Sequence, residues 1–384
     1  MNFEFVTARK IIVKTNGLES IKKLASNYGK KALLVGRQND ETTNKAKTFL
    51  QEENMEVVEI FVKGEPTLEA LNENTAIARK ANVDVVIGIG GGSVIDMAKM
   101  ISALITNTND VLDYLEVIGK AMPLENAAKA FIAIPTTSGT GAEVTKNGVV
   151  SSKEHQVKVS LRSESMYADV VLLDAALTLS LPKHVTASTG MDALTQNIEP
   201  YVSIMANPFT DAFAKEGIQK IASSIKIAYD NGSDLQAREN MAIGSLMGGF
   251  ALANAKLGAV HGFAGVLGGM YDINHGVICA MLLPHVMSAN IQALQDNDPQ
   301  HPILKRFDHV AQLLTNKPNA KAKDGIDWIR NINEHFKMPT LRDLNVKKED
   351  FDEIVEKSKN SSSMKGNPIA LTSDQLRNIL LNAY

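Results

Sequence analysis

The stretch Val83-Asp-Val-Val-Ile-Gly-Ile-Gly-Gly-Gly-Ser93 joins an apolar run to three consecutive glycines and a serine, and a helical pattern follows over Val94–Ile105. The apolar run Val83–Gly88 is typical of a central strand in a parallel sheet. Glycine lets a ligand approach the backbone closely, and a helix N-terminus offers free N–H groups to an anion. We interpret the stretch as a strand, a phosphate-binding turn and a helix; an ordinary strand-to-helix turn is the alternative. It differs from the GxGxxG dinucleotide fingerprint, because Ser93 stands where the final glycine would be.

The segments around this stretch continue the same alternation of strand and helix. Strand Lys31–Gly36 precedes helix Thr42–Glu53, and strand Val57–Val62 precedes helix Pro66–Lys80. This βαβαβ order predicts an α/β domain with a doubly wound, mostly parallel sheet. Gly17–Tyr28 has a further helical pattern. One or two short strands are expected at Phe3–Phe5 and Ile11–Val13, and later strands at Phe131–Pro135, Val157–Leu161 and Val170–Leu173.

The pattern changes after Leu181-Pro182, where long helical periodicities replace the apolar strands. We therefore predict an α/β domain over residues 1–180 and an all-helical domain over residues 181–384. The expected helices are Thr189–Val202, Ala206–Tyr229, Leu235–Leu257, Gly276–Gln295, Ile303–Leu314 and Lys321–Phe336.

Composition limits the function classes that remain open. The 384 residues carry a net charge of −3 with acids and bases interspersed, which argues against a nucleic-acid-binding surface. The sequence shows no signal peptide and no long uninterrupted apolar stretch, so we expect no membrane partner. Cys279 is the only cysteine, so there is no internal disulfide, and a single thiol fits a reducing cytoplasmic location.

Polar residues within the apolar helices are the first candidates for a functional site. Asp192 and Gln196 lie four residues apart and share one helix face. An acid on a buried face is costly without a partner, so a group of opposite character should lie beside Asp192. His261 and His275 are the candidates in neighbouring glycine-rich segments; a hydrogen-bonded core histidine is the alternative reading of His261.

A second polar cluster follows the expected strand Phe131–Pro135. The sequence Thr136-Thr-Ser-Gly-Thr-Gly-Ala-Glu143 is rich in hydroxyl groups and glycines. Ligands of open α/β sheets bind at the carboxyl ends of the strands. This segment is therefore either a ligand-binding loop or an ordinary turn.

Several of these motifs occur together in a fixed order. They are Gly91–Lys99, Pro135–Thr145, Gly190–Thr195, and His275-Gly-Val277 with Leu282-Leu-Pro-His285. In this order they resemble the iron-containing (group III) alcohol dehydrogenases, and the match runs from near the N-terminus to Gly366-Asn-Pro368. The resemblance implies an N-terminal dinucleotide-binding α/β domain and a C-terminal all-helical domain, with the active site in the cleft between them.

The resemblance also implies roles for the residues of the α/β domain. Gly91, Gly92 and Ser93 would hold the pyrophosphate of the cofactor. Lys158 would donate to phosphate or ribose oxygens, as a cation can. The residues expected to line or approach the nucleotide are Thr136, Thr137, Ser138, Thr140, Asn147 and Lys158.

In the helical domain the family typically binds its metal with one Asp and three His. Asp192, His261 and His275 match three of these positions, and Gln196 stands in place of the fourth. Three protein ligands suffice for a catalytic zinc, as in the related glycerol dehydrogenases, and Gln196 could add a weak amide oxygen. Losing an imidazole should weaken iron(II) binding, so both zinc and iron stay open. Many members also carry a histidine where this chain has Gly265.

The resemblance predicts an NAD(P)-dependent alcohol dehydrogenase or aldehyde reductase that acts on a small alcohol or aldehyde. Asp192, His261 and His275 would be catalytic, with a divalent metal polarising the substrate oxygen during hydride transfer. A metal-free site in which a protonated His275 or His261 supplies the proton is the rival mechanism. Rival functions are a maleylacetate-reductase-like or dehydroquinate-synthase-like enzyme and a degenerate member that only binds the cofactor.

The choice of cofactor depends on Arg37, which follows the first core strand. Many members of the family carry an Asp there, which binds the ribose diol and repels a 2′-phosphate. A cation at this position should accept the 2′-phosphate of NADP, so we predict that NADP is accepted, with NAD as the alternative. An Arg37 that points only to solvent is the other reading. By resemblance we also expect a homo-oligomer, a dimer or larger.

Overall fold

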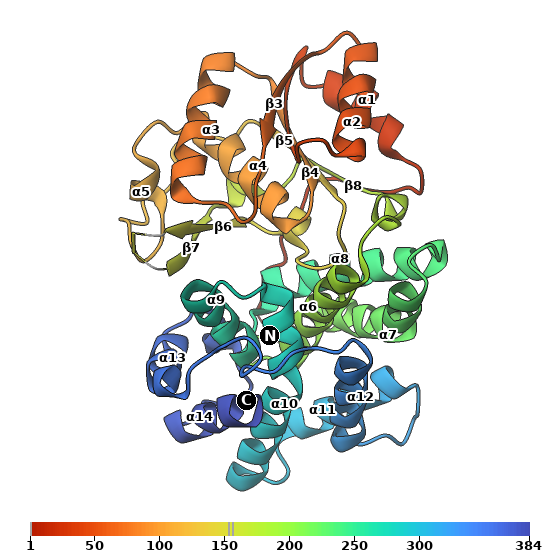
Figure 1. The fold of residues 1–384 in the computed structure, drawn as a ribbon, viewed down its shortest axis with the longest axis vertical. Coiled ribbons are helices and arrows are strands. Elements are labelled where there is room, and N and C mark those ends of the chain that lie inside the picture. The colour runs from red at the N-terminus through yellow and green to blue at the C-terminus, as the bar shows by residue number, and fades with distance from the viewer. Residues whose placement is uncertain (1, 153, 156) are drawn as a thin grey trace. The chain divides into compact units, whose positions relative to one another are not determined.

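The computed structural model describes residues 2–152, 154–155 and 157–384. The chain forms two compact units. One unit contains Val6–Thr137 and Gly141–Ser180, and the other contains Leu181–Tyr384 with Ser138–Thr140 and the residues up to Phe5. Figure 1 shows the sheet in the first unit and a helical second unit. The predicted fold class, an α/β part followed by an all-helical part, is confirmed.

The α/β unit is built on a six-stranded sheet with the order β1-β8-β5-β4-β2-β3, in which every recorded pair is parallel. The strands are apolar because helices cover both faces of the sheet. Helices α1 and α2 lie on one side of the sheet, and α3 and α4 lie on the other (Figure 1). The bounds are β1 Ile11–Val13, α1 Ile21–Ser26, β2 Lys31–Gly36, α2 Glu41–Glu52, β3 Glu56–Phe61, α3 Leu68–Ala81, β4 Val85–Gly90, α4 Gly92–Leu104, α5 Val111–Tyr114, β5 Ala130–Pro135 and β8 Val170–Leu173.

The order of strands reverses between β2 and β4. From β2 the sheet continues to β3, whereas from β4 it continues through β5, β8 and β1. The two strands are neighbours, with Val35 opposite Gly88. Their carboxyl ends, at Gly36 and Gly90, therefore share one edge of the sheet. In open α/β sheets this point of reversal is where ligands bind.

Strand β4 begins and ends two residues later than predicted and includes Gly88 and Gly90. Both glycines are needed because α4 packs closely on the strand. A Cβ atom at Gly88 would lie 2.7 Å from the Cβ of Ala98, and one at Gly90 would lie 2.7 Å from that of Val94. The turn is consequently short, and α4 begins at Gly92 rather than at the predicted Val94.

Two features of the α/β part differ from the sequence-based prediction. The predicted strand at Val157 is half of an antiparallel hairpin, β6 (Asn147–Ser152) and β7 (Val157–Arg162), of which β6 had not been predicted. A strand at Phe3–Phe5 is wrong, because these residues lie in no regular element. The ring of Phe5 instead stacks on that of Phe213, 5.4 Å away, within the helical unit.

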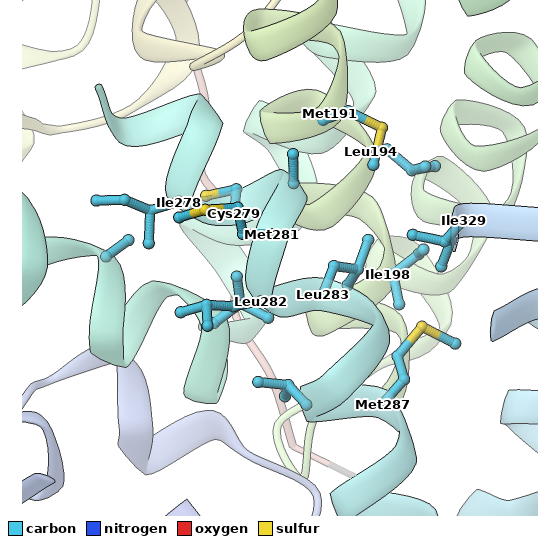
Figure 2. Packing of buried hydrophobic residues seen from close by; sticks show 14 of the residues in the cluster. Met191, Leu194, Ile198, Ile278, Cys279, Met281, Leu282, Leu283, Met287 and Ile329 are labelled. Carbon is cyan, nitrogen blue, oxygen red and sulfur yellow. The ribbon is translucent and has the colours of Figure 1, made fainter. Parts of the chain in front are cut away.

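The helical unit contains α6 to α14, and none of its described residues after Leu181 lies in a strand. Its core contains α6 and α10 side by side, with Ile198 near Leu283 (Figure 2). Helices α9, α13 and α14 were not among the predicted helices. The bounds are α6 Lys183–Val202, α7 Pro208–Asp230, α8 Leu235–Ala255, α9 Ala259–Tyr271, α10 His275–Asn297, α11 Pro302–Thr315, α12 Ala322–His335, α13 Phe351–Lys359 and α14 Ser373–Asn382.

Helix α10 is long and apolar enough to cross a membrane by length and composition alone, and the bent pair α8 and α9 passes the same test together. However, 67% of the apolar window of α10 is buried inside the protein. Its apolar surface is thus already used in the core of the helical unit, as is common for central helices. The absence of a membrane partner stays a prediction.

Candidate active site

Four side chains from three helices of the helical unit form one cluster, three of them buried and His275 partly exposed. Asp192, His261, His275 and Cys279 each offer a ligand atom, and these atoms lie within 4.8 Å of one another. The Oδ1 atom of Asp192 lies 3.4 Å from Nε2 of His261, 3.6 Å from Nε2 of His275 and 3.6 Å from Sγ of Cys279. A carboxylate, two imidazoles and a thiol at these distances are a donor set suited to a divalent transition metal.

Helix α6 supplies the carboxylate from a face that is buried along most of its length. Asp192 is only 2% exposed. The predicted i,i+4 pair is real, since Nε2 of Gln196 donates a hydrogen bond of 3.0 Å to Oδ1 of Asp192. Gln196 therefore orients the carboxylate, while its own Oε1 is buried without a hydrogen-bond partner among the described residues.

His261 lies in the first turn of α9 and is held by a second carboxylate on α6. Nδ1 of His261 lies 2.6 Å from Oε2 of Glu199, and the backbone N–H of Val260 donates to the other oxygen at 2.7 Å. A carboxylate can only accept, so Nδ1 carries the hydrogen and the lone pair of a neutral ring is on Nε2, facing Asp192. This arrangement of carboxylate and histidine is typical behind metal ligands.

His275 begins α10, directly after Asn274, whose side chain accepts from the backbone N–H of Val277. The next residue, Gly276, lets this end of α10 approach α6. A Cβ atom there would lie 2.2 Å from the backbone oxygen of Ser188. The side chain of His275 is 40% exposed, against 5% for His261, so it is the more accessible imidazole of the cluster.

Electrostatics in the cluster favour positive charge beside Asp192. Burial raises the pKa of Asp192, but the charges of His275 and His261 outweigh burial and hold the pKa below its usual value. Burial lowers the pKa of His261, but attraction by Cys279 and the hydrogen bonds of its acidic neighbours raise it well above the usual range. The pKa of His275 is also raised, because Cys279 and Asp192 outweigh the opposing effect of burial. The positive charge could come from a protonated imidazole or from a bound cation.

Sequence reasoning did not assign a role to Glu199 or to Cys279. The sequence spacing of both residues places them on the same helix face as a predicted ligand. Glu199 is seven residues after Asp192, two helical turns along the same face, and Cys279 is four residues after His275. A search for polar residues at helical spacing from each candidate ligand would have named both as candidates, without showing which residues of other helices they contact.

In the α/β unit, the glycine-rich turn and the threonine segment lie together. A Cβ atom at Gly91 would lie 3.3 Å from Cγ2 of Thr137, and the N–H of Thr136 donates to the oxygen of Gly90 at 2.9 Å. Gly91 is the N-cap of α4 and has no side chain with which to cap it, which leaves the N–H groups of the first turn for a ligand. Gly92 and Ser93 form that first turn.

The other predicted cofactor residues are more dispersed. Ser138 and Thr140 belong by their contacts to the helical unit. Asn147 and Lys158 lie on opposite strands of the β6–β7 hairpin but are not paired: Lys158 is opposite Ser151 and forms an ion pair of 2.5 Å with Glu65. Arg37 is exposed and directly follows β2, at the edge of the sheet where the strand order reverses.

Comparison with known proteins identifies the family of the chain. The sequence model described as "Iron-containing alcohol dehydrogenase" matches residues 8–175, and that of the "Fe-containing alcohol dehydrogenase family, C-terminal" matches residues 186–384. The chain belongs to the iron-containing alcohol dehydrogenase family. It is accordingly an oxidoreductase of the alcohol dehydrogenase type.

Similar members of the iron-containing alcohol dehydrogenase family cover nearly the whole chain. Alcohol dehydrogenase 4 of Saccharomyces cerevisiae is 34% identical over 92% of this chain and 91% of its own length. The NAD-dependent methanol dehydrogenase of Bacillus methanolicus is 32% identical over 85% of this chain and 84% of its own. The crystal structure of a 1,3-propanediol oxidoreductase superposes with a TM-score of 0.92 at 32% identity and covers 100% of both chains.

Proposed function

We propose that this protein transfers a hydride between a nicotinamide cofactor, NADP or NAD, and a small alcohol or aldehyde, with a divalent metal at the cluster of α6, α9 and α10. The observation that carries the proposal is the convergence of Asp192, His261 and His275 within 4.8 Å in a family of alcohol dehydrogenases. The names of the relatives, which include methanol and 1,3-propanediol enzymes, support a small alcohol as substrate.

The residues present fit a divalent cation, because a buried carboxylate is paired with two imidazoles whose lone pairs can face it. Asp192, His261 and His275 would hold the ion, which would supply Lewis-acid polarisation of the substrate oxygen. Glu199 keeps the lone pair of His261 directed at the cluster, and Gln196 fixes the carboxylate of Asp192. Zinc and iron both remain candidates for the ion.

The nucleotide would bind at the carboxyl edge of the sheet. The short turn at Gly91 and the uncapped first turn of α4 suit the pyrophosphate, since backbone N–H groups and the helix dipole attract anions there. The hydroxyl group of Thr137 lies next to this turn and can donate to phosphate or ribose oxygens, and the backbone of Thr136 is hydrogen-bonded to Gly90. Arg37, on the neighbouring strand end, would receive a 2′-phosphate.

The metal-free mechanism has one observation in its favour, since the acidic neighbours of His261 and His275 raise the pKa of both imidazoles and so favour the protonated form. A protonated His275, the more exposed ring, would then donate the proton to the oxygen of an aldehyde. In either mechanism His275 is a catalytic residue. A member that binds cofactor without turnover is the third possibility.

One set of assays separates these possibilities. Oxidation of NADPH and NADH is followed with a panel of aldehydes and with maleylacetate, before and after chelation and after return of zinc or iron(II). Loss of activity on chelation, with recovery on one metal, supports the metal site; activity that survives complete metal removal, verified by elemental analysis, contradicts it. Cofactor binding with no turnover under any condition would indicate a degenerate member.

The variant His275→Ala tests the site itself. We expect its turnover to fall by at least about a hundredfold, the lower range for losing a group that acts in proton transfer. The matched control is His335→Ala, which removes a surface imidazole paired with Asp230 in the same unit and should leave turnover unchanged. Full activity of His275→Ala would remove both mechanisms.

A further inference from the structure

Cys279 is the one member of the buried cluster to which the family resemblance assigns no role. It lies one helical turn after His275 on α10 and is fully buried. Figure 2 shows it among the packed side chains of the helical core, beside Ile278 and Met281. A buried cysteine in such a place is often an inert small apolar side chain. Its distances to the other donors indicate a different role.

The recorded distances around Cys279 are close to the edges of a coordination tetrahedron. Zinc binds nitrogen and oxygen at ~2.0–2.2 Å and sulfur at ~2.3 Å, so the atoms of a tetrahedral ligand set lie roughly 3.3–3.7 Å apart. Sγ of Cys279 is 3.6 Å from Oδ1 of Asp192, within this range, and 3.9 Å from Nε2 of His261, slightly beyond it. The oxygen of Asp192 is 3.4 Å and 3.6 Å from the two imidazole nitrogens.

We propose that Cys279 is the fourth protein ligand of the metal, in place of the imidazole that Gln196 has replaced. The proposal rests on the metal site proposed above and specifies its chemistry. As the metal–sulfur bond forms, the thiol proton leaves to solvent and the thiolate binds the ion. A catalytic zinc sometimes expands to five-coordinate, and a fifth position would let the substrate oxygen bind beside four protein ligands.

Gln196 is the rival for the fourth position, because its Oε1 is buried and unpartnered. Its Nε2, however, is committed to Asp192 at 3.0 Å, so the residue already serves to orient the carboxylate. An amide oxygen is also a poorer ligand than a thiolate for a borderline-soft ion. Thiolate ligation shifts the preference of the site from iron(II) toward zinc.

Cobalt(II) substitution tests the proposal directly, because a cobalt–thiolate bond produces an intense charge-transfer band in the near ultraviolet. As Cys279 is the only cysteine of the chain, such a band has a single possible protein source. We expect the wild-type protein to show this band together with visible d–d bands. Cys279→Ser and Cys279→Ala should lose the charge-transfer band, and their dissociation constant for zinc should rise by at least about tenfold, the lower range for damage to a metal's ligand shell.

Two control variants accompany these measurements. Ile278→Val removes a similar volume from the neighbouring buried position and should leave the spectrum and the zinc affinity unchanged. Gln196→Leu removes the rival oxygen without adding another donor and should retain the charge-transfer band. Visible bands without a charge-transfer band in the wild type would overturn the role of Cys279 and leave the proposed metal-dependent function standing. A wild-type protein that binds neither cobalt nor zinc would overturn that function as well.

The identity of the natural metal gives a second readout that does not depend on activity. Protein purified from cells supplied with equal iron and zinc should contain zinc, and Cys279→Ser should lose zinc relative to iron. Iron in excess of zinc in the wild type, with the same ratio in Cys279→Ser, would contradict a thiolate ligand.

Discussion

At the scale of single residues, the family motif Gly91–Lys99 does more than form a turn. Its last residue, Lys99, is fully buried and donates from Nζ to the oxygens of Ala142 and Asn147 at 2.6 and 2.7 Å. Lys99 therefore ties α4 to the segment that follows the threonine loop. Glu143 is buried in the same place, and its burial raises its pKa to about 7.

The raised pKa of Glu143 predicts a pH dependence of stability. A carboxyl whose folded pKa of about 7 exceeds its ordinary value of 4.5 keeps its proton in the folded chain after the unfolded chain has lost it. Its contribution to stability is thus complete below the ordinary pKa and is lost as pH rises through the folded pKa, by at most about 1.4 kcal/mol per pH unit. Glu143→Gln mimics the protonated form and lacks this pH dependence. Thermal melts should therefore show the wild type losing stability relative to the variant as pH rises from the ordinary pKa to the folded pKa. If the melting temperatures of Glu143→Gln and the wild type changed in parallel with pH, the prediction would be contradicted. We expect such parallel behaviour for the control Glu53→Gln, at an exposed position.

Arg37 is the residue on which the cofactor prediction depends. We expect Arg37→Asp to raise the KM for NADP relative to NAD by about tenfold or more, because a charge-assisted hydrogen bond to phosphate is worth ~1.5–3 kcal/mol. Steady-state kinetics with both cofactors measure the ratio. Gln38→Asp places the same charge on the neighbouring exposed residue and should change the ratio less. An unchanged ratio in Arg37→Asp would mean that Arg37 faces only solvent.

At the scale of elements, the cluster of Asp192, His261, His275 and Cys279 depends on how closely α10 approaches α6. The two helices bring together Asp192 and the pair His275 and Cys279, which lie on one face of α10. The contact is made at Gly276, where the backbone oxygen of Ser188 occupies the space of a side chain. Close packing of the two helices therefore explains why glycine stands in the His-Gly-Val motif.

Gly276→Ala should force the two helices apart. Overpacking of this kind costs about 1–3 kcal/mol, and the displacement of His275 should weaken zinc binding as well. The matched control is Gly265→Ala on α9, where a Cβ would meet nothing within 4 Å. That change should stabilise the helix by about 0.5–1 kcal/mol, since glycine is a poor helix former. Thermal melts and zinc titrations of both variants test this, and equal behaviour of the two would refute it.

At the scale of the whole molecule, the chain passes between its two units four times. The crossings follow Phe5, Thr137, Thr140 and Ser180, so the division near residue 180 is one of several. The assignment of a cofactor domain to residues 1–180 and a catalytic domain to residues 181–384 stays a prediction, as does the oligomeric state. The N-terminal end is anchored by Phe5, whose ring contacts those of Phe209, Phe213 and Phe250.

Loss of this anchor should destabilise the helical unit. We expect Phe5→Ala to cost about 1–3 kcal/mol, below the ~3–5 kcal/mol of a fully buried phenylalanine because Phe5 is only half-buried. Phe3→Ala is the control, since Phe3 is 43% exposed and meets only the ring of Phe209 among the recorded ring pairs. Thermal unfolding of the two variants measures the difference, and an equal loss would contradict the anchoring role.

The sequence by itself determined the fold class and the family, and it singled out three of the four side chains that cluster in the helical unit. Apolar strands, helical periodicity and glycine motifs are local signals, so a single chain is enough to read them. Local signals failed where packing overrides propensity, as in α9, which carries Gly262, Gly265, Gly268 and Gly269 and is nonetheless a helix.

Only the tertiary structure decided which side chains complete the cluster. Cys279 is 87 residues from Asp192 in sequence, and Glu199 is 62 residues from His261. No periodicity relates residues so far apart. Their approach follows from the packing of α6 against α9 and α10, which depends on side-chain volumes along all three helices rather than on any one segment.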